Sequence, residues 1–180
     1  MPRMIEDLRE NLLQQARQLL LEDGGGGLTI RRVAARCHVA VGTVYNYFQS
    51  KDELMAQVML RDWRASMDSM HRIAQHAPTV MEGLESMCRE VRSFAALYRD
   101  VWMRYAETGG MMPQLTPRHA LLVGQVQEMV AMLLERHGCL WTEYLPTYLA
   151  ETVLTASGRG EEGFEQIRTI LMRLTAKEYA

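Results

Sequence analysis

Apolar residues recur every three or four positions along most of this chain, which is the spacing of one face of an α-helix. In the first third of the chain the pattern predicts a short helix over 30–37, a turn over 38–40 and a second short helix over 41–47. Thr29 directly precedes the first short helix, and its hydroxyl can cap the free amides of the first turn. The apolar stripe of that helix consists of Ile30, Val33, Ala34 and Cys37.

The second short helix has two faces of different character. Val44 and Phe48 fall close together on its inner side, whereas Thr43, Asn46 and Tyr47 look outward. The pattern therefore predicts two short helices that pack through their apolar sides around a tight turn.

Longer amphipathic stretches surround this pair. They predict helices over 4–22, 51–75, 117–136, 142–157 and 161–176, and a helical segment from Val80 that breaks between Ser93 and Leu97. The sequences Ser50-x-x-Glu53 and Thr79-x-x-Glu82 are capping boxes, which mark helix starts. Four glycines, at 24–27, are expected to end the first helix. The fold class predicted is all-α.

Composition restricts the class of protein further. The chain has 180 residues, of which 48% are hydrophobic and 23% charged, as is ordinary for a globular protein. No apolar run approaches the ~20 residues that a membrane span needs, and the first residues lack the apolar core of a signal peptide. We therefore expect a cytoplasmic protein without membrane contact. The three cysteines are an odd number at wide spacing, which argues against a disulfide framework. For Cys37 we expect a structural role, with redox sensing as the alternative.

Charge is unevenly distributed around the two short helices. The whole chain has a formal net charge of −2. Between Gly24 and Lys51, however, it carries no Asp or Glu, while Arg31, Arg32, Arg36 and Lys51 are cationic. Short helices around a tight turn, basic and free of acids, suit docking against a phosphate backbone.

The same stretch matches a family motif at fixed spacing and without a gap. The matching residues are Thr29, Ile30, Val33, Ala34, Val39, Gly42, Thr43, Val44, Tyr45, Tyr47, Phe48, Ser50, Lys51 and Leu54. This stretch closely resembles the DNA-binding half of the TetR family of bacterial transcriptional repressors. The resemblance covers about a quarter of the chain, and it departs from the family pattern at Cys37 and Val41.

The resemblance implies an architecture. It implies a three-helix helix-turn-helix DNA-binding domain over 1–50, followed by a helical bundle over 51–180 for ligand binding and dimerisation, with about nine helices in total. No linker-like composition separates the two parts, so we place their boundary within the long helix that begins at Lys51.

The outward residues of the second short helix have distinct predicted roles. Tyr45, Tyr47 and Lys51 suit phosphate contacts that fix register without reading sequence. Thr43 can bond to a base or a phosphate, and Asn46 can bind adenine bidentately if it points into the groove. Core packing is the alternative for both tyrosines and for Asn46. The predicted DNA-binding residues are Thr29, Arg31, Val41, Gly42, Thr43, Tyr45, Asn46, Tyr47 and Lys51, of which Arg31 is assigned by the resemblance.

A second group of residues is soft and bulky, which leaves two interpretations open. They can form ordinary core, as their helical spacing predicts, or line an apolar cavity that adapts to a ligand. The resemblance favours a cavity for a small, largely apolar effector. The residues are Trp63, Met67, Met70, Met87, Phe94, Tyr98, Trp102, Tyr105, Met129 and Leu133.

The last two predicted helices carry apolar stripes that are wide for helices packed on one side. The resemblance implies that these helices pair with their copies in a homodimer. Two recognition helices separated by one DNA turn, ~34 Å, can then read a palindrome. The predicted dimerisation residues are Leu145, Tyr148, Leu149, Val153, Phe164, Ile167, Ile170, Leu171 and Leu174.

Enzymatic motifs are missing from the sequence. It contains no E-x-x-H, G-x-S-x-G, H-E-x-x-H or P-loop, and its five histidines are scattered, so we expect no catalysis, metal or cofactor. The leading hypothesis is a homodimeric repressor that binds a palindromic DNA operator and is released by a small apolar ligand. The alternatives are a protein-binding coactivator or scaffold of the same fold, and a helical-bundle enzyme.

Overall fold

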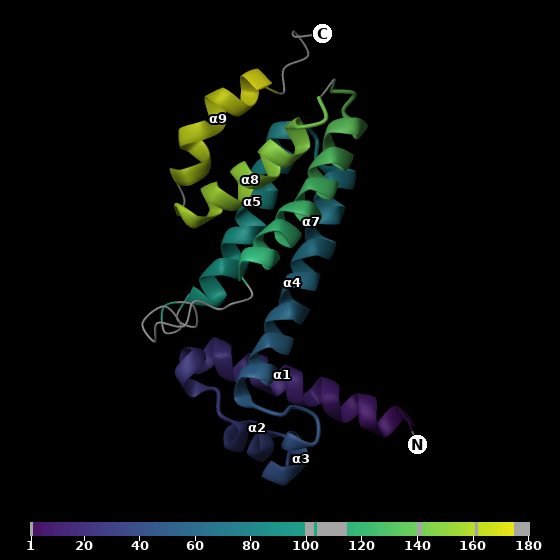
Figure 1. Cartoon of the computed structure of the whole chain (residues 1–180), viewed down its shortest axis with the longest axis vertical. Coiled ribbons are helices and arrows are strands. Elements are labelled where there is room, and N and C mark those ends of the chain that lie inside the picture. Colours follow the sequence, from purple (N-terminus) through teal and green to yellow (C-terminus); the bar gives the residue numbers. More distant parts are fainter. Residues whose placement is uncertain (1, 100–102, 104–114, 140–141, 161, 175–180) are drawn as a thin grey trace. The chain divides into compact units, whose positions relative to one another are not determined.

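The computed structural model describes residues 2–99, 103, 115–139, 142–160 and 162–174 (Figure 1). Every regular element in these residues is helical, which confirms the all-α prediction. The helices are α1 (Pro2–Gly27), α2 (Ile30–Arg36), α3 (Val41–Tyr45), α4 (Lys51–His76), α5 (Val80–Leu97), α7 (Leu115–Arg136), α8 (Leu145–Gly158) and α9 (Glu162–Leu174). None of these helices combines the length and the apolar content needed to cross a membrane.

The chain divides into two compact units. The first contains Met1–Trp63 together with Leu97–Glu107, and the second contains Arg64–Ala96 together with Thr108–Ala180. Helix α4 is continuous and contributes to both units, since the division falls after Trp63.

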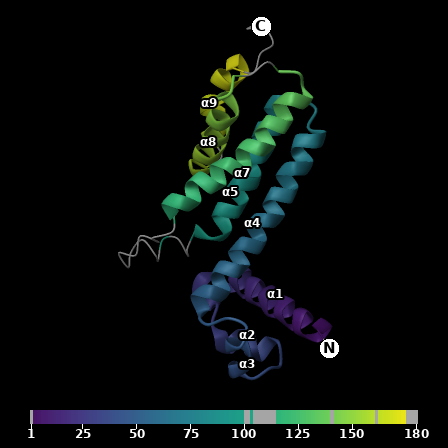
Figure 2. The ribbon, with the colours of Figure 1, turned by 45° about the vertical axis from the view of Figure 1, so that its right-hand side comes forward.

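The first unit packs α1, α2, α3 and the beginning of α4 around one core. In both views α2 and α3 lie side by side, next to α1 (Figures 1 and 2). The apolar stripes predicted from the sequence form this core. Its fully buried side chains include Leu12, Leu19, Val33, Val44, Phe48, Leu54 and Val58.

A hydrogen-bonded group with little access to water ties three segments of the first unit together. The Nε atom of Arg17 on α1 donates to both carboxylate oxygens of Asp62 on α4, at 2.7 and 2.8 Å. The hydroxyl of Tyr98, the residue after α5, donates to the same carboxylate at 2.9 Å. The Asp62 side chain is only 11% exposed and Tyr98 is fully buried, so these bonds are poorly screened by solvent.

The glycines after the first helix act differently from the expected stop. Regular helix breaks at Gly24, which has a φ of +65°, but one further helical turn continues to Gly27. A Cβ atom at Gly27 would lie 2.2 Å from the Cβ of Asp23, so no larger residue fits there without a shift. The positive φ at Gly24 and the close approach at Gly27 explain two of the four glycines.

The second unit consists of α5, α7, α8, α9 and the C-terminal half of α4. Helix α7 packs along α8, and α9 packs on α8 (Figure 2). Helices α5 and α7 approach closely, because a Cβ atom at Gly83 would lie 2.5 Å from Cδ2 of Leu133. The buried core includes Met70, Leu84, Met87, Val126, Val130, Leu133, Leu149, Val153 and Leu171.

Most helix boundaries lie close to the positions that the capping residues in the sequence predict. Helix α4 begins after Ser50, whose hydroxyl accepts a hydrogen bond from the amide of Glu53 at 3.0 Å. Helix α5 begins after Thr79, whose hydroxyl accepts a hydrogen bond from the amide of Glu82 at 3.2 Å. Helix α3 is shorter than the expected 41–47, because the amide of Asn46 is shared between the carbonyls of Gly42 and Thr43 and the last turn tightens. Residues 175–176 of the last predicted helix lie outside the described residues.

Tyr98→Phe tests the buried group. Burial, then the charge of Asp62 and the bond to it, raise the pKa of Tyr98 well above its ordinary value of 10.0. The folded state therefore favours the neutral phenol. This contribution is complete below pH 10 and is lost as the pH rises further, because only the unfolded tyrosine then ionises. We expect the variant to lose about 1–2 kcal/mol in free energy of unfolding at neutral pH. Urea denaturation across pH 7–11 measures this, and a wild-type advantage that grows above pH 10 would contradict the assignment.

Candidate nucleic-acid interface

Helices α2 and α3 are joined by a turn whose geometry is set by local hydrogen bonds. The amide of Val39 donates to the carbonyl of Ala34 at 3.0 Å, and that of His38 to Ala35 at 3.2 Å. This pattern closes α2 with a left-handed residue after its end. His38 occupies that position, with a φ of +54°, where glycine is more usual.

The inner faces of the two helices are buried as predicted. Ile30, Val33 and Ala34 of α2 pack in the core, as do Val44 and Phe48. Thr29 caps α2 by accepting a bond from the amide of Arg32 at 3.2 Å. Because the inner stripes are fixed, the orientation of the outer residues is fixed with them.

The opposite face of α3 and the residues around it are accessible. Tyr45 is 50% exposed and Val41 38%, so neither is a core residue of the chain. Thr29, Arg31, Gly42 and Asn46 are also exposed, and Thr43, Tyr47 and Lys51 are partly exposed. The structure thus brings the nine predicted DNA-binding residues into one unit and leaves each of them at least partly accessible.

Gly42 has no structural role within the described residues that explains its lack of a side chain. A Cβ atom there would meet nothing within 4 Å, and the residue does not have a positive φ. The described residues therefore do not require glycine at this position.

Two of the four cations in this stretch are compensated by the end of α1. Arg32 forms an ion pair with Asp23 at 2.6 Å and donates to the carbonyl of Gly27 at 2.9 Å. Arg36 binds the carboxylate of Glu22 through both terminal nitrogens, and this bond holds the pKa of Glu22 below its usual value. The cationic excess expected from the sequence is therefore smaller in the folded unit. The sequence count missed these acids because they precede Gly24.

Arg31 differs from its neighbours, since among the described residues it forms no ion pair. Its exposed guanidinium remains available to an anion. At the start of α4 the side chain of Glu53 accepts a bond from the amide of Gln49 at 2.6 Å. This helix end therefore already holds one carboxylate of its own beside Lys51.

Sequence reasoning missed the residues that brace the unit from α1. Arg9 lies over the ring of Phe48, 5.5 Å from its centroid, and donates to Gln57 at 3.2 Å. Arg61 of α4 pairs with Glu10 at 2.7 Å. No local signal reveals these pairs, because the partners lie far apart in sequence.

The predicted ligand-binding residues do not belong to one unit. Trp63 and Tyr98 are buried in the first unit. In the second unit Met70, Met87 and Leu133 are buried, and Met67, Phe94 and Met129 are partly buried. Trp102 and Tyr105 lie outside the described residues. Burial of this kind fits both core and a closed cavity, so the ligand pocket stays a prediction.

The predicted dimerisation residues fall into two groups. Leu149, Val153, Phe164 and Leu171 are buried within the chain, whereas Tyr148 and Ile170 are each 54% exposed. Leu145 and Ile167 are partly exposed, and the side chain of Leu174 lies outside the described residues. The exposed members can contact another chain, and the buried members hold α8 and α9 together.

Cys37 and Cys88 are free thiols in this structure. Burial raises the pKa of the Cys37 thiol and of the Cys88 thiol, although a bond from Ser157 acts in the opposite direction at Cys88. A raised pKa lowers the thiolate fraction, which weakens the redox alternative for Cys37. In the described part of the chain no three His, Cys, Asp or Glu residues are grouped to hold a metal ion.

Two helices around a tight turn, buried inside and accessible outside, form a helix-turn-helix, the module of one large class of DNA-binding proteins. The family described as bacterial regulatory proteins, tetR family, matches residues 12–58. Residues 12–58 therefore form a helix-turn-helix region of the TetR family of bacterial regulatory proteins.

Individual relatives agree with this assignment. An HTH-type transcriptional regulator of Haemophilus influenzae is 30% identical over 96 residues, covering 53% of this chain and 44% of that protein. The regulator HbdR of Aromatoleum sp. is 26% identical over 100 residues, covering 53% and 41%. The match therefore spans less than half the length of these curated relatives.

Solved structures share the fold over nearly the whole chain. A TetR-family regulator of Pectobacterium atrosepticum superposes with a TM-score of 0.72 at 22% identity, covering 98% of each chain. A regulator from Rhodococcus sp. RHA1 gives 0.68 at 18% identity, covering 95% of this chain and 96% of that one. At these identities the likeness concerns the fold alone.

His38→Gly tests the strain in the turn. Glycine adopts a positive φ without steric cost, so we expect a gain of about 0.5–1 kcal/mol in free energy of unfolding. Ala35→Gly is the control, because Ala35 is an exposed position within α2, where glycine relieves no positive φ and should destabilise by about 0.5–1 kcal/mol. Chemical denaturation measures both variants. Equal destabilisation by the two substitutions would show that His38 is not strained.

Proposed function

We propose that this chain regulates transcription by binding a palindromic DNA operator as a homodimer, with α3 in the major groove, and that it acts in the cytoplasm as a repressor. The observation that carries the proposal is the accessible face of α3. Val41 and Tyr45 are exposed apolar or aromatic residues on a helix whose inner residue, Val44, is fully buried, and a Cβ atom at Gly42 would meet no described atom within 4 Å. A surface of this kind suits close approach to bases and phosphates.

Each accessible residue has a chemical role in this proposal. Val41 and Gly42 allow contact with thymine methyl groups, and Thr43 and Asn46 offer hydrogen bonds to base edges. Tyr45 and Tyr47 donate to phosphates from rigid rings, and Thr29, Arg31 and Lys51 act on the same backbone. Few of these groups read bases, so one copy of the chain would discriminate weakly between sequences.

A homodimer provides a second copy of α3, which can bind the other half of a palindromic operator. Besides Tyr148 and Ile170, the residues Tyr144 and Met172 are exposed on or next to α8 and α9, at 76% and 48%. Large apolar side chains gathered on one helix pair are typical of an interface with another chain. In this proposal the α8–α9 pair forms a four-helix contact with its copy.

Release by a small, largely apolar effector completes the proposal. Helix α4 starts at the DNA-binding residues and continues without interruption into the second unit, where Met70 is buried. A ligand that favours one position of α4 would change the spacing of the two recognition helices. Such a ligand shifts the equilibrium only by its difference in affinity for the two states.

Arg31→Ala and Lys51→Ala test phosphate contact, with Arg32→Ala as the matched control. We expect the wild-type protein to bind DNA from the promoter of its own or adjacent genes. Its affinity should fall steeply as the salt concentration rises. Each of the first two variants removes one phosphate contact from each protomer, so it should flatten the log–log slope of the dimer by about two. Arg32 is paired with Asp23, so its removal should leave the slope near that of the wild type. Fluorescence anisotropy at several salt concentrations measures the slopes.

Two results would reject operator binding. One is affinity that does not depend on salt, and the other is no binding to any fragment selected from the source genome. A flattened slope for Arg32→Ala, equal to that of Arg31→Ala, would show that the ion pair with Asp23 does not persist.

Ile170→Glu tests the dimer. A carboxylate in the middle of an apolar interface is desolvated without a partner, so we expect the variant to be monomeric with unchanged helicity. Thr169→Glu, on an exposed neighbouring position of α9, should remain dimeric. Sedimentation equilibrium gives the masses, and circular dichroism the helicity. A wild-type protein that is monomeric at micromolar concentration would contradict the proposed interface.

A further inference from the structure

The second unit contains a groove between the C-terminal turns of α4 and the N-terminal turns of α5. Its cavity volume is about 480 Å³. This volume falls within the roughly 300–1,000 Å³ that is usual for small-molecule sites. The groove is separate from the predicted apolar pocket, because none of the residues predicted for that pocket lines it.

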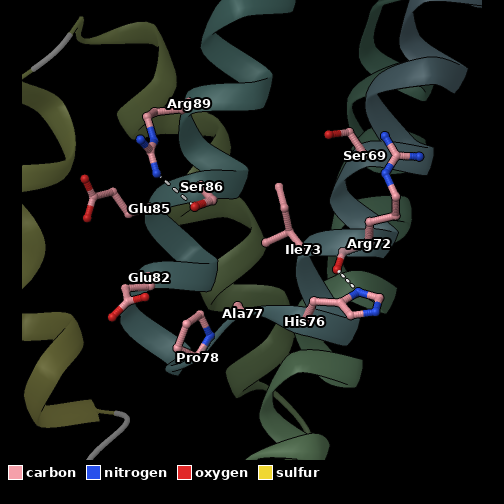
Figure 3. A pocket seen from close by; sticks show the side chains of 10 residues that line it. All are labelled: Ser69, Arg72, Ile73, His76, Ala77, Pro78, Glu82, Glu85, Ser86 and Arg89. Atoms are coloured by element: carbon pink, nitrogen blue, oxygen red, sulfur yellow. Dashed lines mark hydrogen bonds between the residues drawn. The ribbon is translucent and has the colours of Figure 1, made fainter.

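The groove has apolar and cationic parts. Ile73, Ala77 and Pro78 supply apolar surface. Arg72 stands at the α4 edge and Arg89 at the α5 edge, with Ile73 and Ser86 between them (Figure 3). A molecule lying in the groove would thus have a guanidinium group on either side and an apolar surface beneath it.

The two arginines are not neutralised within the described part of the chain. Neither Arg72 nor Arg89 forms an ion pair with a described residue, and Arg89 donates only to the hydroxyl of Ser86, at 2.9 Å. Two carboxylates also line the groove. That of Glu85 is compensated by Arg168 of α9, at 2.8 Å, which leaves Glu82 against two guanidinium groups. The charge balance therefore favours an anion.

The groove is braced at both ends. At one end the Ser69 hydroxyl of α4 donates to Glu90 of α5 at 3.0 Å. At the other end the carbonyl of Ala77, in the corner between the helices, accepts a bond from Arg136 at 2.7 Å and lies 3.1 Å from Nε2 of His137. Helix α7 thereby holds the corner in place. A cavity held open in advance binds its ligand at a smaller entropic cost.

We propose that the α4–α5 groove binds a small organic anion, namely a carboxylate attached to an apolar ring or short chain. The guanidinium groups of Arg72 and Arg89 attract the anion from the two edges of the groove, and either group can make paired hydrogen bonds to its carboxylate. The Ser86 hydroxyl adds a donor, and Ile73, Ala77 and Pro78 contact the apolar body. The inference concerns the protein alone and does not require that it bind DNA.

Benzoate is a suitable probe for this site, because it joins a carboxylate to an apolar ring. NMR titration of the full chain would follow the Nε–H signals of Arg72 and Arg89 and the methyl signals of Ile73. We expect saturable shifts at all three residues. Benzyl alcohol, which lacks the charge, and inorganic phosphate, which lacks the ring, should bind more weakly than benzoate.

Arg72→Ala and Arg89→Ala should each weaken benzoate binding by about fivefold to tenfold, as expected for partly exposed charge-assisted bonds. Arg64→Ala is the matched control, since Arg64 is an exposed arginine of α4 that does not line the groove. It should leave the affinity within about twofold of the wild type. All three positions are exposed, and circular dichroism verifies that the variants fold.

Three results would overturn the proposal. They are the absence of saturable shifts at the groove, an equal loss of affinity in Arg64→Ala, and phosphate binding as tight as that of benzoate. Without saturable shifts there is no binding site in the groove. An equal loss of affinity in Arg64→Ala would mean that benzoate responds to the general surface charge. Phosphate binding as tight as that of benzoate would mean that the apolar surface does not contribute to binding. Because no DNA is present, failure here leaves the proposed operator binding untouched.

Discussion

The carboxylate of Asp62 is the contact on which the first unit depends most. It receives both bonds of the Arg17 Nε group and the hydroxyl of Tyr98, in surroundings where water competes little. Loss of one partner would leave a poorly hydrated charge or donor without compensation, which costs more than the intact group contributes. Through Asp62 the first helix, the long helix α4 and the residue that follows α5 are held as one body. The helix-turn-helix is built on this frame, because α2 and α3 are too short to be stable alone.

Electrostatics within that unit are arranged so that only part of its positive charge faces outward. Asp23 and Glu22 hold Arg32 and Arg36 against the end of α1, where the cations stabilise the junction with α2. Arg31 lies beside them, is exposed and forms no ion pair with a described residue. The same residue type thus has two functions in adjacent positions, and the difference is set by which acids lie within reach.

In the second unit, important polar contacts lie at the ends of helices. The carbonyl of Ala77 is satisfied by Arg136 and His137. Gly138 follows two residues after the end of α7, and its φ of +61° suits the left-handed position. These contacts hold the corner between α4 and α5 without filling it, so a cavity remains there, lined in part by Arg72 and Arg89, which form no ion pair with a described residue. Apolar packing closes the interior around Met87 and Leu133, so an adaptable core and a polar groove coexist in one bundle.

Local sequence alone determined the helices, their caps and the inner stripe of the helix-turn-helix. Thr29, Ser50 and Thr79 cap the helices that they were expected to cap, because capping acts within three or four residues and needs no tertiary contact. Val33, Val44 and Phe48 are buried for the same reason, since helical periodicity reports which face is apolar. Tertiary structure decided which charges remain free. Arg17 meets Asp62 across 45 positions, and Asp62 meets Tyr98 across 36, distances in sequence that no local pattern spans. Only the crossing of helices brings such groups together, and only the folded structure shows that Arg32 pairs with Asp23 while Arg31, Arg72 and Arg89 form no ion pair with a described residue.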